Sequence, residues 1–168
     1  MINFEQQRSG LRRRIVGKAA SIIPMSFVPA QLLFRLDREV FRLSRGRTTF
    51  SAWVSGLPIV MLTTTGARTG QPRTVPVLGL PDGERLVVIA SNFGQLRHPG
   101  WYHNLSARPY AVVTWNGSAA EMHARELTGE QRERYLTRSH EAYPWWEQYH
   151  RRAAPRQIPL IMLEPLVA

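Results

Sequence analysis

Two arginines, a threonine and two glycines lie close together in the stretch G-A-R-T-G-Q-P-R of residues 66–73. Glycine tolerates positive φ angles, with which consecutive backbone N–H groups can converge on one anion. Arg68 and Arg73 add guanidinium groups whose geometry matches phosphate or carboxylate oxygens. The stretch therefore predicts an anion-binding loop, and a solvated polar hairpin loop is the alternative.

The other reactive side chains exclude several enzyme classes. The chain has no cysteine, so neither a disulfide framework nor a thiolate nucleophile is available. Its histidines lack the H-x-x-x-H spacing of a metal site, and its carboxylates are scattered. An aromatic cluster at residues 143–149 is consistent with a surface patch for a partner subunit or a membrane. No metal site is expected.

Six runs of apolar and β-branched residues predict the strands that position these groups. The dipeptide Asn116-Gly117 is a strong hairpin signal, and Pro81-Asp82-Gly83-Glu84 has the composition of a turn. Neither βαβ alternation nor a G-x-G-x-x-G motif is present, which argues against a Rossmann sheet. The pattern favours a mainly β (α+β) fold, a small antiparallel barrel with expected strands at residues 59–65, 74–80, 85–91, 110–115, 119–127 and 158–164.

Residues 1–50 form a basic leader that holds most of the chain's net charge of +10. Amphipathic helices are expected at residues 11–23 and after Pro29, where apolar residues recur at helical spacing (Leu32, Leu36, Val40 and Leu43). A basic helix with an apolar face can bind an anionic membrane, which makes residues 11–45 the candidate contact, or it can pack on the body or on a partner subunit. No nucleic-acid-binding motif accompanies the charge, so nucleic acid is not expected as a partner.

We therefore divide the chain into this leader and a barrel domain at residues 51–168. Two further helices are expected in the barrel domain: a short one from Pro99 to about Arg108, and a charged one at residues 129–142. Thr128 and Gln131 resemble a capping box at the start of the second. The sequence lacks a run of about 18 apolar residues and a signal peptide, so we expect a cytoplasmic protein, with peripheral contact on the inner face of the membrane as an addition.

Four segments stand out together in this order and spacing: L-T-T-T-G-A-R-T-G-Q-P-R (62–73), V-V-I-A-S-N (87–92), P-G-W-Y-H-N-L (99–105) and I-P-L-I-M-L-E-P (158–165). In combination they resemble the deazaflavin (F420)-dependent oxidoreductase family of actinobacteria, often labelled nitroreductase. The resemblance covers roughly residues 57–165 and implies a split β-barrel of the FMN-binding type. It also implies transfer of a hydride from reduced F420 to a quinone, an activated alkene or a nitro compound.

The same resemblance implies which residues form the site. In relatives, the loop, the strand and the short helix hold the cofactor, which here gives Arg68, Thr69, Gly70, Arg73, Pro76, Ala90, Ser91, Asn92, Trp101 and Asn104. Tyr143, Trp146 and Tyr149 match the aromatic residues that lie over the acceptor and would be catalytic. Some relatives carry a basic residue in place of Ala67 and a lysine in place of Asn92, so phosphate binding here would depend more on the two arginines.

Two alternatives to this function remain open. One is a split-barrel oxidoreductase that prefers FMN, and the other is a non-enzymatic carrier of a deazaflavin or a flavin. The expected partner in the first case is a small hydride acceptor, and a homodimer is expected because dimers are common among split barrels.

Overall fold

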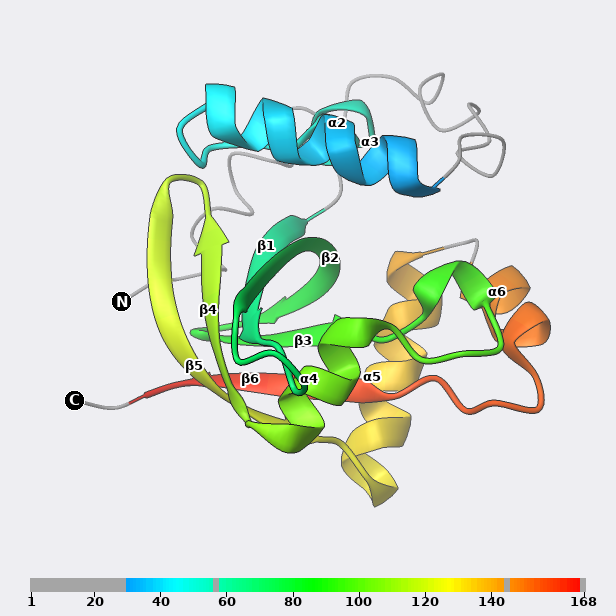
Figure 1. Cartoon of the computed structure of the whole chain (residues 1–168). Coiled ribbons are helices and arrows are strands. Elements are labelled where there is room, and N and C mark those ends of the chain that lie inside the picture. The colour runs from blue at the N-terminus through cyan, green and yellow to red at the C-terminus, as the bar shows by residue number, and fades with distance from the viewer. Residues whose placement is uncertain (1–29, 56–57, 144–145, 167–168) are drawn as a thin grey trace.

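The computed structural model describes residues 30–55, 58–143 and 146–166 (Figure 1). Six antiparallel strands close into a barrel in the order β1-β2-β3-β6-β5-β4, and β4 pairs again with β1. This confirms the predicted six-stranded barrel and differs from the expected strands mainly at their ends. The strands are β1 (Ile59–Thr65), β2 (Pro72–Asp82), β3 (Arg85–Ile89), β4 (Tyr110–Trp115), β5 (Ser118–Glu126) and β6 (Leu160–Pro165).

Helices cover parts of this barrel. In Figure 1, α2 and α3 lie across one end, whereas α5 and α6 lie together on another side. None of the helices within the described residues is long and apolar enough to cross a membrane. The predicted helix at residues 11–23 falls outside the described residues. The helical elements are α2 (Ala30–Leu43), α3 (Phe50–Ser55), the 3-10 turn η3 (Asn92–Gly94), α4 (Gly100–Ala107), α5 (Gly129–Ala142) and α6 (Trp146–Ala153).

Strand β3 is buried on both faces, which explains its continuous apolar sequence. Leu86 and Val88 belong to the core that includes Trp101 and other inward residues, whereas Val87 belongs to a second core with residues of α5 and α6. Since successive side chains point to opposite faces of a strand, alternate residues reach the two cores. Strand β6 alternates in the same way, with Ile161 and Leu163 in the first core and Leu160 and Met162 in the second.

The predicted hairpin and turn both form. Asn116 and Gly117 have φ angles of 49° and 80°, as a two-residue turn of the primed type requires, and they join β4 to β5. Gly117 N–H also donates to Gly46 O at 2.9 Å, so the segment after α2 lies on this hairpin. Gly83 takes the left-handed corner between β2 and β3 with φ +64°.

Asp82 at the end of β2 connects the barrel to α5. Its carboxylate accepts hydrogen bonds from Tyr135 Oη at 2.6 Å and Arg138 Nη1 at 3.2 Å, and Arg85 Nη2 lies 2.8 Å away. Burial raises the pKa of Asp82, but these hydrogen bonds and positive charges outweigh burial and hold its pKa below the ordinary value. The ionised carboxylate therefore stabilises the docking of α5.

The predicted capping box at the start of α5 is wrong. Thr128 is the N-cap residue, but its side chain makes no capping hydrogen bond. Gln131 Oε1 instead accepts a hydrogen bond from Arg125 Nη1 at 2.9 Å, so it is directed to strand β5. A long-range partner has replaced the local one.

Helix α2 is joined to α3 by a buried carboxylate. Asp37 is 2% exposed, and it accepts hydrogen bonds from Ser51 N–H at 2.7 Å and Ser51 Oγ at 2.8 Å. Burial raises the pKa of Asp37, although the two hydrogen bonds from Ser51 oppose that effect. Thr49 Oγ1 adds a cap by accepting from Ala52 N–H at 3.0 Å.

The predicted apolar face of α2 is largely exposed. Leu32, Leu36 and Leu43 are 49%, 38% and 76% exposed, and only Val40 of the four residues is half-buried. The spacing therefore predicted the helix correctly, but within the described residues this face is not covered.

Candidate functional site

The loop between β1 and β2 (residues 66–71) is a tight turn closed by backbone hydrogen bonds. Gly66 N–H donates to Gln71 O at 2.9 Å, and Gly70 N–H donates to Gly66 O at 2.8 Å. Gly70 has φ +67°, and a Cβ added at Gly66 would lie 2.8 Å from Thr69 Oγ1. Both glycines are therefore required by the turn, which leaves Arg68 and Thr69 exposed at its tip.

Asn104 of α4 fastens this loop to the barrel. Its Nδ2 donates to Thr64 Oγ1 at 2.9 Å, and its Oδ1 accepts from Ala67 N–H, also at 2.9 Å. Thr64 is buried near the end of β1, whereas Ala67 is exposed in the loop. Both polar groups of this predicted cofactor residue are thus engaged within the protein, and they set the position of the loop.

The tip of the loop offers donors that have no partner among the described residues. Arg68 and Arg73 are exposed, and neither forms a salt bridge with a described residue. The backbone N–H groups of Arg68 and Thr69 also lack a hydrogen-bond partner among the residues described. Arg108, which the sequence analysis did not identify, donates from Nη1 to Gly66 O at 3.3 Å. This set of cations and amides fits an anionic group such as a phosphate.

The remaining predicted cofactor residues occupy strand β2, helix α4 and the segment after β3. Trp101 is 8% exposed and belongs to the barrel core, one helical turn before Asn104. Pro76 is half-buried on β2, opposite Met61 of β1. Ala90 is fully buried, and it leads into a loop that connects β3 to α4.

This second loop (residues 90–99) has an unusual backbone. Asn92, Phe93 and Gly94 have consecutive φ angles of 47°, 55° and 76°, all in the left-handed region that favours glycine. Asn92 Nδ2 donates to Arg97 O at 3.0 Å and stabilises the loop from within. Since non-glycine residues adopt this conformation only where surrounding contacts enforce it, the loop is held in place by its neighbours.

The three predicted aromatic residues are placed differently from one another. Tyr143 is buried, and its hydroxyl donates to Gly79 O at 2.7 Å. Trp146 is 2% exposed in the second core, and its Nε1 has no hydrogen-bond partner among the described residues. Tyr149 is half-buried on α6, its ring centroid lies 6.3 Å from that of Phe93 in an edge-to-face arrangement, and burial raises its pKa. Tyr149 is thus the one of the three that lies against the second loop.

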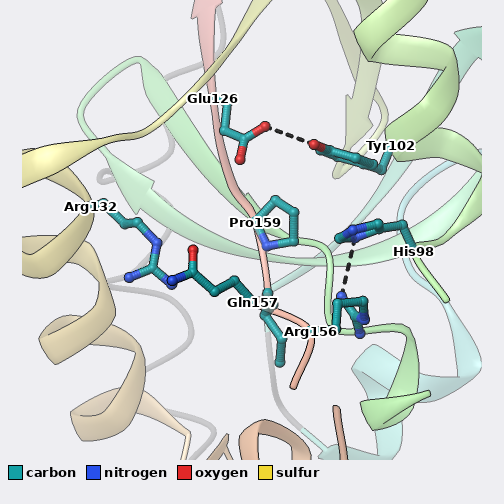
Figure 2. Close-up of a pocket in the computed structure, with 8 residues that line it drawn as sticks. His98, Tyr102, Glu126, Arg132, Arg156, Gln157 and Pro159 are labelled. Atoms are coloured by element: carbon teal, nitrogen blue, oxygen red, sulfur yellow. Dashed lines mark hydrogen bonds between the residues drawn. The ribbon is translucent and has the colours of Figure 1, made fainter. Parts of the chain in front are cut away.

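A cavity of about 310 Å³ lies between α4, the end of β5, α5 and the segment before β6 (Figure 2). Figure 2 shows Tyr102 Oη donating to Glu126 on one side, at 2.9 Å, and His98 beside Arg156 on another. Burial lowers the pKa of His98, and the charges of Arg156 and His103 lower it further, against a weaker opposite effect of Glu126. None of the predicted site residues is among the eight that line the cavity.

Comparison with known proteins identifies the family. The model of the family described as F420H(2)-dependent quinone reductase matches residues 33–165. The chain belongs to this family. Family membership confirms the resemblance that the four sequence segments indicated, and the match also includes most of α2, which lies in the leader.

Individual members of the family support the same assignment. An F420H(2)-dependent quinone reductase from Mycobacterium tuberculosis is 42% identical over 78 residues, which are 46% of this chain and 51% of that protein. This chain therefore spans about half the length of that curated relative. A solved F420-H2 dependent reductase has a TM-score of 0.59 and 37% identity, covering 64% of this chain and 94% of its own. A second solved structure, described as a domain-swapped dimer, has a TM-score of 0.61 and 33% identity, covering 76% and 95%.

Proposed function

We propose that this family member binds reduced F420 and catalyses transfer of a hydride from it to a quinone. The observation that carries the proposal is the cationic β1–β2 loop, which Asn104 fastens to the barrel and whose N–H groups at Arg68 and Thr69 have no partner among the described residues. The donor set matches the acidic tail of a phosphate-containing cofactor, which family membership names as F420H2. Activated alkenes and nitro compounds are proposed as further acceptors of the same hydride.

When bound, the reduced deazaflavin supplies the hydride, and the protein residues bind and shield it. Arg68, Thr69, Gly70 and Arg73 would hold the acidic tail, while Ala90, Ser91 and Asn92 would lie beside the ring system. Pro76 and Trp101 complete the pocket from β2 and α4.

We assign the acceptor side to the aromatic residues at the end of α5 and in α6: Tyr143 directly follows α5, and Trp146 and Tyr149 belong to α6. Tyr149 orients the acceptor through its phenol, because its ring is half-buried against Phe93 of the second loop. Its pKa is raised by burial, so the phenol stays protonated and able to donate a hydrogen bond at neutral pH. Tyr143 and Trp146 support Tyr149 by packing beneath it in the second core.

Charge reversal tests whether residues 66–73, which we call the phosphate loop, bind the phosphate of the cofactor. Each charge-assisted hydrogen bond contributes about 1.5–3 kcal/mol, so Arg68→Glu and Arg73→Glu should each weaken F420 binding by at least about tenfold. Arg134→Glu on α5 makes the same change of charge at an exposed position and should leave the affinity within about twofold. Titrations of the full chain with F420 and with FMN, followed by fluorescence, measure these affinities. Equal binding by the loop variants and wild type would overturn the assignment, and tighter binding of FMN would replace F420 as the cofactor.

We also propose that α2 binds peripherally to an anionic membrane surface. Its exposed leucines (Leu32, Leu36 and Leu43) accompany exposed arginines (Arg35, Arg38 and Arg42), the composition of a helix that lies in a lipid interface. This contact would bring the enzyme to quinones dissolved in the bilayer.

Flotation with anionic and neutral vesicles tests the membrane proposal. The wild-type chain should float with anionic vesicles, and the variant Leu36→Ser/Leu43→Ser should lose this association. Leu96→Ser removes an exposed leucine outside α2 and should float like wild type. If the α2 variant floats unchanged, the proposal is wrong. If it instead converts a dimer to a monomer in solution, the exposed face is the contact of a homodimer.

A further inference from the structure

Arg156, between α6 and β6, is bonded through all of its side-chain donors to the segment after β3. Nε donates to Gln95 O at 3.0 Å, and Nη2 donates to the same oxygen at 2.8 Å and to Ser91 O at 2.9 Å. Nη1 donates to Ala90 O at 3.2 Å and lies 3.2 Å from His98 Nδ1, a contact visible in Figure 2. One guanidinium therefore gathers three carbonyl oxygens of residues 90–95, which are the residues that open the second loop.

Every polar contact that the structure describes for the Arg156 guanidinium is with a residue of this second loop. No described carboxylate forms a salt bridge with the guanidinium, so backbone carbonyl dipoles are the groups that compensate it. Burial accordingly lowers the pKa of Arg156. Without the guanidinium, Ala90 O and Gln95 O would lose these donors, whereas Ser91 O would keep its bond from Gly94 N–H at 2.9 Å.

Helix α6 contacts the same loop at Gly94. A Cβ added at Gly94 would lie 2.8 Å from Arg152 Cβ and 3.0 Å from Tyr149 O, so the loop backbone is in close contact with the helix. The left-handed residues Asn92, Phe93 and Gly94 thus lie between the carbonyls held by Arg156 and the surface of α6. Contacts on both sides account for a backbone conformation that non-glycine residues otherwise avoid.

We propose that Arg156 is a positioning residue that sets the shape of residues 90–95 of the second loop before the cofactor binds. The inference rests on the proposed function, because Ala90, Ser91 and Asn92 are the residues assigned to the deazaflavin ring. Arg156 acts through their backbone carbonyls and is not itself a catalytic residue. Without Arg156, the loop also adopts conformations that do not bind the cofactor. The apparent affinity for the cofactor then falls in proportion to the fraction of molecules whose loop can bind.

The test compares Arg156→Gln and Arg156→Lys with wild type. Arg156→Gln should raise the KM for F420H2 about tenfold and change kcat by less than about twofold, since saturating cofactor restores the loop. Lysine keeps the charge but offers one nitrogen, which cannot reach three carbonyls, so Arg156→Lys should recover only a small part of the loss. Arg138→Gln is the matched control, because Arg138 also donates to a carbonyl, Pro81 O at 3.0 Å, away from this loop.

A cofactor-free readout separates this inference from the proposed function. Arg97 is an exposed trypsin site within the second loop, and cleavage after it can be followed by mass spectrometry in the full chain. Arg156→Gln and Arg156→Lys should be cut there at least about tenfold faster than wild type and Arg138→Gln, in proteins that all remain folded by thermal melting. If wild type binds no F420 but the cleavage pattern holds, the proposed function fails while the positioning role of Arg156 stands. Unchanged cleavage in the folded lysine variant, or an unchanged KM in a protein that does use F420H2, would overturn the inference.

Discussion

Replacing Asn104 with alanine removes the two hydrogen bonds through which this residue connects the β1–β2 loop to the barrel, and leaves the bond from Arg108 to Gly66 O. The two partners of Asn104, Ala67 N–H and the hydroxyl of Thr64, differ in whether water can replace the lost hydrogen bond. Ala67 N–H is in an exposed loop and returns to water, at a loss of about 0.5–1.5 kcal/mol. The hydroxyl of Thr64 is buried and stays unsatisfied, at a loss of about 1–3 kcal/mol. We therefore expect Asn104→Ala to lower the free energy of unfolding by about 2–4 kcal/mol.

The same change should weaken binding of F420. If about 1.4 kcal/mol of the loss is the energy that holds the loop in its binding position, the apparent dissociation constant rises about tenfold. Asn104→Asp makes a useful contrast, because a carboxylate still accepts from Ala67 N–H and can accept from the hydroxyl of Thr64. It should fold nearly as well as wild type but bind F420 more weakly, since it adds a negative charge beside the anion site.

A double-mutant cycle measures this connection directly. Thr64→Val, Asn104→Ala and the combined variant are unfolded in urea, and the two single losses should exceed the combined loss by about 1 kcal/mol. Ser106→Ala on the same helix is the control, because Ser106 Oγ donates only within the helix, to Tyr102 O at 3.0 Å. Additive losses within about 0.3 kcal/mol, or an unchanged affinity of Asn104→Ala for F420, would refute the reasoning.

Three further predictions concern the stability of the fold, each measured by urea unfolding. Asp82→Asn should lower the free energy of unfolding by about 1–3 kcal/mol at pH 7. Because the pKa of Asp82 is lowered in the folded protein, this difference from wild type should disappear as the pH falls below about 4 and the carboxylate is protonated. A difference that persists at pH 2 would contradict the prediction. Asp37→Asn keeps an acceptor for Ser51 N–H and removes the charge of a buried carboxyl whose pKa is raised, so at pH 7 this variant should be at least as stable as wild type. Asp37→Ala removes the acceptor as well and should lose about 1–2 kcal/mol. Equal losses in the two variants would show that the charge itself is needed. Gly94→Ala should lose about 2–4 kcal/mol from overpacking and strain, and Gly83→Ala, which has a similar φ but open space around it, only about 1 kcal/mol; equal losses would show that contact with α6 is unimportant.

The strands of this protein could be predicted because their patterns are local. Continuous apolar runs mark β3 and β6, which separate two cores, and Asn116-Gly117 marks the β4–β5 turn. The turn between β1 and β2 was also recognisable, since its two glycines lie within five residues of sequence, between two strand-like runs. Spacing predicted helix α2 as well, but an apolar spacing does not say whether the face is covered.

The residues that fix the loops could not be predicted in the same way. Arg108 donates to a carbonyl 42 positions away, and Arg156 to carbonyls 65 and 66 positions away. A single arginine that bonds to distant backbone has no sequence signature, because only the folded chain brings the two together. Helix α6 did have a signal: Trp146, Tyr149 and Ala153 recur at helical spacing, and the structure buries all three at least in part. The aromatic composition of the same segment also fits a surface patch, so the spacing alone does not decide between the two.

Closure of the barrel limits how this protein can associate with other chains. Because β4 pairs with both β5 and β1, each of the six strands has a hydrogen-bonded neighbour on either side along at least part of its length, and the described sheet has no terminal strand. Pairing of two barrels through a terminal edge strand is therefore unavailable while the barrel stays intact. A second subunit would instead meet side chains on the outer surface, or the barrel would open and exchange a segment.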